Sequence, residues 1–162
     1  MSMKHFNQII FLLGFTLFGF VAQAATLEID FKTPEDYTDI SPGFEGTQFS
    51  IEDYTYALQE HLNTLASKLP STYMLQMTMT DIDLAGNTQL YNVRVIKPIY
   101  APRLVFSYQL KDEQQQVIAK DDVNITDRAF MNNISLKYQD DFVGFEKQLL
   151  DGWFKKAFAT IH

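Results

Sequence analysis

The chain contains no cysteine, and this absence excludes several classes of protein. Without thiols there is no disulfide framework and no cysteine nucleophile or zinc ligand. A bacterial lipoprotein also needs a cysteine at its cleavage site, so that form of lipid anchor is excluded. A small secreted eukaryotic domain usually relies on disulfides, so the bacterial periplasm is the favoured compartment if the chain is exported.

Positive charge is also scarce. Thirteen Lys and Arg oppose 20 Asp and Glu, which gives a formal net charge of -7. Nucleic acids and anionic membrane surfaces would repel such a chain, so we expect neither as a partner. Only 7 Gly and 5 Pro are present, and 46% of the residues are hydrophobic, which indicates a globular protein rather than a disordered or collagen-like one.

Histidine is rare as well, and the chain has few other catalytic parts. Of the three histidines, His5 lies in the first segment and His162 ends the chain, so His61 is the only internal one. A lone histidine beside an apolar helical stripe is usually a partly exposed helix residue. No Gly-x-Ser-x-Gly elbow, His-Glu-x-x-His pair, phosphate loop or dinucleotide fingerprint occurs, so we predict no cofactor.

The first 24 residues have the three-part pattern of a secretory signal peptide. A basic start at Lys4 precedes an apolar block over residues 9–21, and Ala22-Gln23-Ala24 follows. The block is shorter than the about 20 residues that span a bilayer, so we expect cleavage after Ala24 and no remaining membrane anchor. Residues 25–162 are then predicted to form one soluble periplasmic domain.

Hydrophobic periodicity predicts the first half of the domain. Alternation over residues 27–31 predicts a strand. Ser50 is a favourable helix N-cap with Asp53 three residues later, and Pro70 ends the helix. The apolar face of this helix consists of Ile51, Tyr54, Leu58, Leu62, Leu65 and Leu69.

A second strand is predicted over residues 73–79, and its inward and outward positions exchange near Asp81. Continued alternation would bury two aspartates, so we expect a bulge or strand end there and a turn at residues 85–87. Residues 91–95 predict another short strand. Residues 103–111 and 117–125 predict a hairpin in which Asp121 interrupts the apolar set.

The last predicted element is a helix that starts near Asp140 and Asp141 and ends past Lys155 and Lys156. The order of elements predicts an α+β two-layer fold, with a mostly antiparallel sheet and two helices on one face. The last helix carries a wide aromatic stripe. Such a stripe usually fills a core, but the alternative is an exposed patch of Trp153, Phe154 and Phe158 that receives a partner.

Residues 81–86, Asp-Ile-Asp-Leu-Ala-Gly, begin like a calcium loop. The pattern fails at Ala85 and Asn92, where carboxylates are expected. A weaker cation site of Asp81, Asp83 and a third acid such as Asp121 stays open. The other interpretation is that one aspartate caps the turn backbone while the second pairs with Arg94 or Arg103.

The string from Thr80 to Gly86 resembles the bacterial domain-of-unknown-function family 3016, which is typical of secreted proteobacterial proteins. The resemblance implies a single periplasmic α+β domain and no activity or catalytic residues. It extends along the chain through Arg94-Val95, Pro102-Arg103, Tyr108, Glu146, Leu150, Trp153 and Phe154.

Three functional hypotheses follow from these patterns. The leading one is a non-enzymatic binding or accessory module that contacts another envelope protein through the aromatic residues of the last helix. The alternatives are a small-ligand or divalent-cation domain centred on Asp81 and Asp83, and a hydrolase that pairs Asp81 with Asp83 or Glu146. Arg94, Arg103 and Glu146 are expected to be structural polar residues.

Overall fold

The computed structural model describes residues 25–33, 36–40, 49–88 and 94–161. The predicted signal peptide and Tyr91 and Val93 of the expected short strand lie outside the described residues. No helix within the described ranges is long and apolar enough to cross a membrane.

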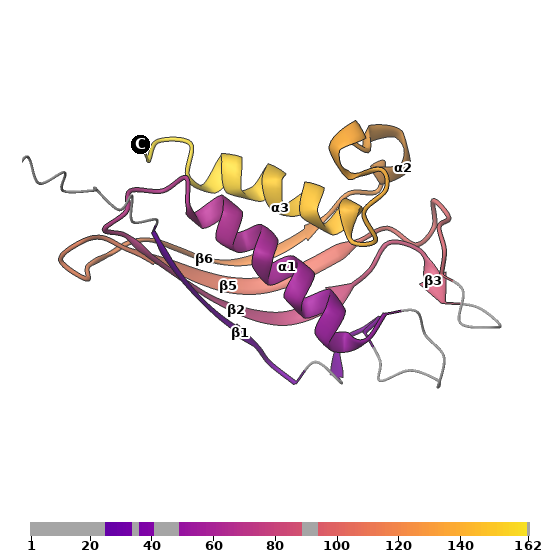
Figure 1. The fold of residues 1–162 in the computed structure, drawn as a ribbon, viewed down its shortest axis with the longest axis horizontal. Coiled ribbons are helices and arrows are strands. Elements are labelled where there is room, and N and C mark those ends of the chain that lie inside the picture. The colour runs from indigo at the N-terminus through magenta and orange to yellow at the C-terminus, as the bar shows by residue number, and fades with distance from the viewer. Residues whose placement is uncertain (1–24, 34–35, 41–48, 89–93, 162) are drawn as a thin grey trace, which may run out of the picture.

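A curved four-stranded sheet forms one layer of the domain (Figure 1). The strand order is β1-β2-β5-β6, and only the β1-β2 pair is parallel. The chain returns from the end of β1 to the start of β2 through α1, as a parallel pair requires. A small second sheet pairs β3 with β4. The strands are β1 (Thr26–Phe31), β2 (Met74–Asp83), β3 (Asn87–Thr88), β4 (Arg94–Val95), β5 (Arg103–Lys111) and β6 (Val117–Thr126).

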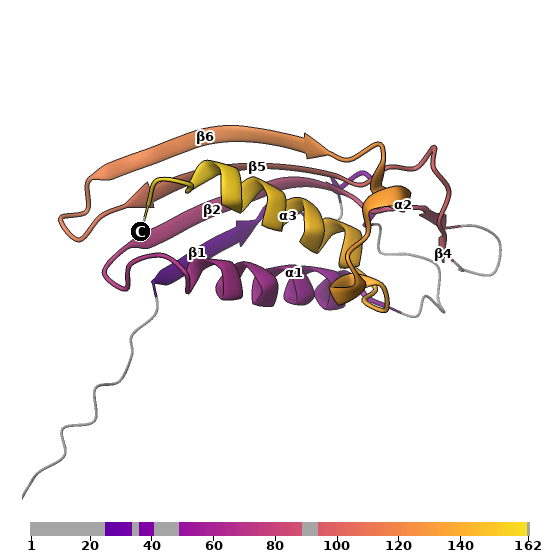
Figure 2. The same cartoon turned by 90° about the horizontal axis from the view of Figure 1, so that it is seen from above.

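The two long helices form the second layer, and both lie on the same face of the sheet (Figure 1). Seen from above, α3 lies between α1 and β6 (Figure 2). This arrangement confirms the predicted α+β fold with a mostly antiparallel sheet. The helices are α1 (Ile51–Ala66), α2 (Phe130–Asn133), the short 3-10 helix η3 (Leu136–Tyr138) and α3 (Gly144–Ala157).

The predicted capping box starts α1. The Ser50 hydroxyl accepts a hydrogen bond from the Asp53 amide at 3.2 Å, and the Asp53 carboxylate accepts one from the Ser50 amide at 2.8 Å. A cap of this kind stabilises a helix by about 1 kcal/mol. The start of α1 was therefore readable from the sequence.

The helix α3 begins at Gly144, later than the predicted start near Asp140. Asp141 instead closes the preceding turn, because its carboxylate accepts hydrogen bonds from the Val143 amide at 3.0 Å and from Lys147 Nζ at 2.6 Å. A Cβ atom at Gly144 would lie 2.2 Å from the Tyr138 carbonyl oxygen. Only glycine fits where this turn enters the helix.

The predicted bulge lies in β2. Met79 pairs with Phe106 and Asp81 with Val105, so Thr80 is an extra residue in the β2-β5 ladder. Because of this extra residue, Met79 and Ile82 both point into the core. Asp81 and Asp83 therefore lie on the outer face of the sheet.

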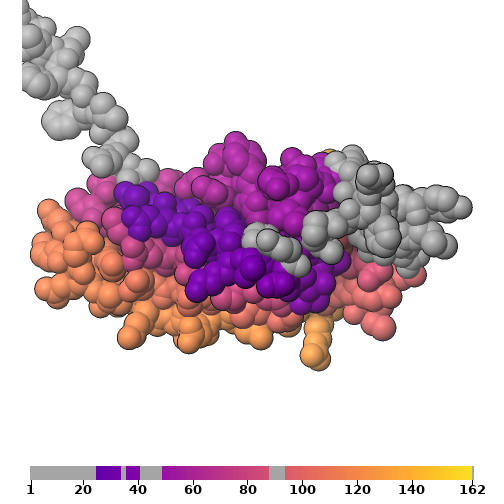
Figure 3. Space-filling model, turned by 90° about the horizontal axis from the view of Figure 1, so that it is seen from below, coloured from indigo at the N-terminus to yellow at the C-terminus, as the bar shows by residue number. Residues whose placement is uncertain are grey.

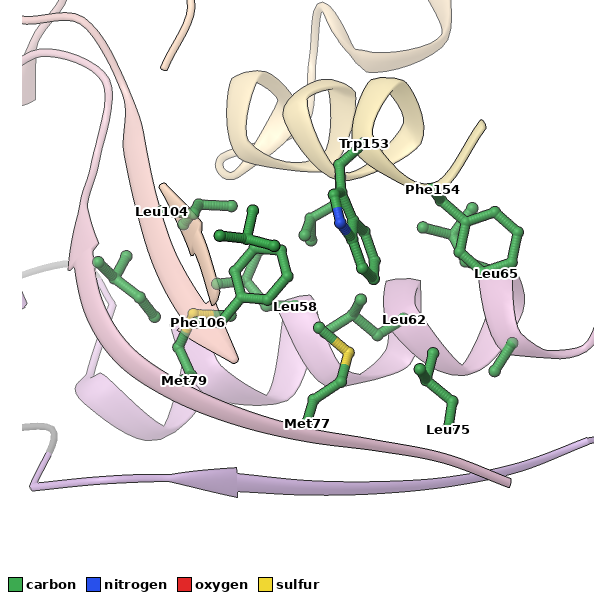
Figure 4. Packing of buried hydrophobic residues seen from close by; sticks show 14 of the residues in the cluster. Leu58, Leu62, Leu65, Leu75, Met77, Met79, Leu104, Phe106, Trp153 and Phe154 are labelled. Atoms are coloured by element: carbon green, nitrogen blue, oxygen red, sulfur yellow. The ribbon is translucent and has the colours of Figure 1, made fainter. Parts of the chain in front are cut away.

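The core fills the space between the concave sheet face and the two helices (Figure 4). Leucines of α1 meet methionines of β2 and aromatic rings of β5 and α3. The fully or nearly fully buried members include Leu58, Leu62, Leu65, Leu75, Met79, Leu104, Phe106 and Leu150.

Candidate functional site

Asp81 is held in a polar network at the bulge. Its carboxylate accepts hydrogen bonds from the Thr38 amide at 2.8 Å and the Thr38 hydroxyl at 2.9 Å, and it forms an ion pair with Arg103. Partial burial acts to raise the pKa of Asp81, but these hydrogen bonds and the Arg103 charge hold it below its usual range. Asp81 is therefore a structural anion with its oxygens already used.

Asp83 lies beside a second acidic residue, Asp39. Burial and the nearby Asp39 charge raise the pKa of Asp83. Arg94 pairs with Asp39 at 2.5 Å and also donates to the Ala85 carbonyl at 3.3 Å. Arg94 and Arg103 thus each form an ion pair with an aspartate, and Asp39 is a partner of Arg94 that was not predicted. Asp39 follows no recognisable motif, so only the fold reveals the pair.

The proposed cation site of Asp81, Asp83 and Asp121 is not assembled. Asp81 pairs with Val105 and Asp121 pairs with Tyr108, three residues further along β5. The alternation of the strands also places Asp121 on the inner face, opposite to Asp81. Within the described ranges, no three metal-ligating side chains come together. The separation across the sheet is the physical reason that this interpretation is wrong.

Glu146 caps the turn that follows β2. Its Oε1 accepts a hydrogen bond from the Ala85 amide at 2.7 Å, and the residue is only 1% exposed. Burial raises the pKa of Glu146 to about 7, although the Ala85 hydrogen bond acts to lower it. The turn is therefore capped by a residue of α3 and not by an aspartate of β2. An enclosed carboxyl cannot contact a substrate, so a hydrolase pair of Asp81 with Glu146 has no support.

The aromatic residues of α3 are in the core and do not form a surface patch. Trp153, Phe154 and Phe158 are 7%, 8% and 4% exposed. The Trp153 ring packs edge-on against Phe106 with 4.8 Å between the ring centroids (Figure 4). The centroids of the Phe158 and Tyr108 rings are 5.5 Å apart. The interpretation of these rings as a partner-binding patch is wrong, because the curved sheet leaves a wide space that α3 must fill.

His61 belongs to a polar link between three elements, which the sequence analysis missed. Its Nε2 lies 2.9 Å from Asp151 Oδ1 on α3, and the Tyr138 hydroxyl donates to Asp151 Oδ2 at 2.7 Å. Burial lowers the pKa of His61, while Asp151 acts to raise it. His61 follows Leu58 by three positions, so helical periodicity could have placed it on the buried face.

A hollow of about 490 Å³ lies beside His61. The hydroxyl of Thr64 also lines it, but this group donates to the Glu60 carbonyl at 3.1 Å on its own helix. The imidazole in turn is paired with Asp151. The arrangement links α1 to α3.

A groove of about 740 Å³ lies between α3 and β6, and we call it the α3-β6 groove. Trp153 and Tyr108 form part of its lining, and Phe145 and Leu149 of α3 form one wall. Val123 of β6 contributes to the other side. The groove therefore offers apolar side chains from both of its sides.

Carboxylates dominate the charged residues of this groove. Asp121, Asp122 and Asp127 line it, with Lys156 as the one basic residue of the lining. Asp121 is on the inner sheet face, where its strand neighbours across the sheet are apolar. Burial raises the pKa of Tyr108, and the Asp121 charge raises it further. Asp121 is the charged residue that interrupts the apolar alternation of β6, and it lines the groove.

Gly152 lies in the interior of α3 and lines the groove. A Cβ atom at this position would meet no other atom within 4 Å, in contrast to Gly144. Glycine in a helix interior costs about 0.5–1 kcal/mol relative to alanine. The packing of the chain itself therefore does not require glycine here.

A comparison with models of protein families identifies a match. The family model described as "Protein of unknown function (DUF3016)" matches residues 25–156. No curated protein matches the chain. The matched range includes the bulge, the Glu146 cap and most of the α3-β6 groove.

Proposed function

The chain belongs to the DUF3016 family. We propose that it is a non-enzymatic binding module of the bacterial cell envelope. The periplasmic location rests on the signal pattern of residues 1–24. The binding site is the α3-β6 groove. Its ligand is a polypeptide segment of a second envelope protein.

The observation that carries this proposal is Gly152. An exposed glycine in the interior of α3 lowers the stability of the helix, and no described residue occupies the space that a side chain would take. A partner that approaches closely at this point gives the missing reason for glycine. The groove next to it presents apolar side chains together with carboxylates and amides, so it offers a ligand both apolar and polar contacts.

The chemistry of the groove supports binding over catalysis. Its charged groups are three aspartates and Lys156, and no histidine or serine is among the residues that line it. His61, the remaining internal histidine, is paired with Asp151 in a different part of the fold. A nucleophile with an adjacent base is therefore not assembled in the groove.

The proposal is tested by site-specific crosslinking in cells. A photo-reactive amino acid replaces Gln148, which lines the groove, or Leu136, which is highly exposed outside it. We expect one discrete adduct from position 148 and none of the same size from position 136. The same adducts from both positions, or none from position 148, would overturn the proposal.

Substitutions of Gly152 provide matched variants for this experiment. Gly152→Trp fills the groove and should abolish the adduct, and Gly152→Ala, whose methyl group takes the space left for the close approach, should weaken it. An adduct of undiminished yield in Gly152→Ala, with both variants folded by circular dichroism, would mean that no partner requires glycine at this position.

A further inference from the structure

We infer that the occupant of the α3-β6 groove is an extended, basic segment of the partner that adds as a fifth strand beside β6. This inference rests on the proposed function and specifies its ligand. Three features of the described residues support it. They are the open edge of β6, the charge of the groove and the space at Gly152.

The strand β6 ends the sheet, and within the described chain it pairs with β5 only. Figure 2 shows it along one side of the domain, and the space-filling view from below shows the same strand along the margin of the sheet (Figure 3). Ten residues, Val117–Thr126, form this edge. The outward backbone groups of an edge strand can pair with an extended segment of another chain.

A strand added at this edge would place alternate side chains in the groove. Side chains on the inner face of β6 are those of Ala119, Asp121, Val123 and Ile125. The inward side chains of the added strand would lie next to them, between the sheet and α3. The residue of the added strand that lies next to Asp121 would contact its carboxylate. The residues next to Val123 and Ile125 would contact an apolar surface near Gly152.

The charge of the groove selects a basic segment. Three aspartates face one lysine in the lining, and the whole chain has a net charge of -7. A Lys or Arg side chain next to Asp121 would form an ion pair over the Tyr108 ring, partly shielded from water. The sequence pattern that fits is therefore a basic residue followed at the second and fourth positions by apolar residues.

Asp121 also argues against a second copy of this chain as the occupant. An inward-pointing charge on an edge strand opposes pairing between two identical edges. In an antiparallel β6-β6 pair, Asp121 and Asp122 of each copy would approach the same acidic residues of the other. Like charges placed opposite each other destabilise a strand pair. The edge is therefore open to a basic segment and unfavourable for itself.

Fluorescence anisotropy with four synthetic peptides tests the inference on the purified protein. The first peptide is fluorescein-labelled Thr-Lys-Thr-Val-Thr-Ile-Thr, and the second has Glu in place of Lys. The third and fourth have the first sequence with alternate backbone amides methylated, one peptide for each of the two phases. We expect the first to bind at least tenfold more tightly than the second. We also expect one phase of methylation to abolish binding, because it removes the donors that face β6.

Two variants assign the charge effect to the groove. Asp121→Asn should weaken the Lys peptide about tenfold, while Glu52→Gln, the same charge change on the exposed side of α1, should leave its affinity within twofold. Equal binding of the Lys and Glu peptides, no binding of any peptide, or equal effects of the two variants would overturn the inference. If the crosslink at position 148 forms, weakens in Gly152→Ala and is lost in Gly152→Trp, the binding function stands even when the basic strand does not.

Discussion

Replacement of Glu146 by Gln gives the sharpest test of the buried network. The carboxyl of Glu146 is enclosed and accepts a hydrogen bond from the Ala85 amide. Glutamine keeps an acceptor oxygen for this amide and stays neutral at every pH. The substitution therefore removes the ionisation of residue 146 with little change in shape.

The magnitude follows from the pKa. Burial raises the pKa of Glu146 from an ordinary value of 4.5 to about 7. A difference of one in pKa corresponds to about 1.4 kcal/mol, so full ionisation of the buried carboxyl lowers the free energy of unfolding by about 3 kcal/mol. The folded state binds the proton more tightly than the unfolded state. This stability is therefore fully present below pH 4.5 and is lost as the pH rises through about 7.

Urea unfolding at pH 4.5, 6 and 8 measures this effect. We expect the free energy of unfolding of Glu146→Gln to be close to that of the natural protein at pH 4.5 and to exceed it at pH 8 by up to about 3 kcal/mol. The gain is smaller if the amide nitrogen of Gln replaces an oxygen that accepts a hydrogen bond in the natural protein. Glu52→Gln, at an exposed position, serves as the control and should show no such change with pH. A constant difference between Glu146→Gln and the natural protein across the three pH values would refute the reasoning.

Three further predictions concern the helices. Gly152→Ala should raise the free energy of unfolding by up to about 1 kcal/mol, because alanine favours a helix interior and its methyl group enters open space, and a higher urea midpoint with an unchanged slope would show this. The double substitution Phe154→Ala and Phe158→Ala should unfold the protein, since each buried ring removed costs about 3–5 kcal/mol, and retention of the native circular dichroism spectrum would contradict their burial. Because the folded state holds the pKa of His61 below 6.5, stability should fall as the pH drops through 6.5, and His61→Gln should reduce the difference in melting temperature between pH 5 and pH 7.5. An unchanged difference in that variant would mean that another group is responsible.

Local sequence patterns predicted most of the secondary structure. Alternation predicted the strands, the Ser50 cap predicted the start of α1, and the exchange of inward and outward positions at Asp81 predicted the bulge. These features depend on neighbours within a few residues. The start of α3 was placed too early because Asp141 has the charge of a helix N-terminus but uses its carboxylate to close the turn before it.

The candidate site was far less accessible from the sequence. The ion pair of Asp81 with Arg103 was one of the alternatives, yet the cap of the same turn comes from Glu146, 61 residues away along the chain from Ala85. The α3-β6 groove depends on which strand ends the sheet, and strand order is a property of the whole fold. Asp121 was visible as a charge in an apolar pattern, but only the position of α3 turns that anomaly into part of a groove.

The parallel pairing of β1 with β2 has a consequence for how the chain folds. Glu28 of β1 and its partner Gln76 are 48 residues apart, whereas β5 and β6 are joined by a short turn. Contacts between distant residues form slowly because the intervening chain must first be ordered. We therefore expect β1 to dock after the β5-β6 hairpin has formed, and until it docks one edge of β2 is unpaired and the side chains of Leu27, Ile29 and Phe31 are uncovered. A substitution that weakens the docking of β1 would open this edge of β2 to pairing with another chain.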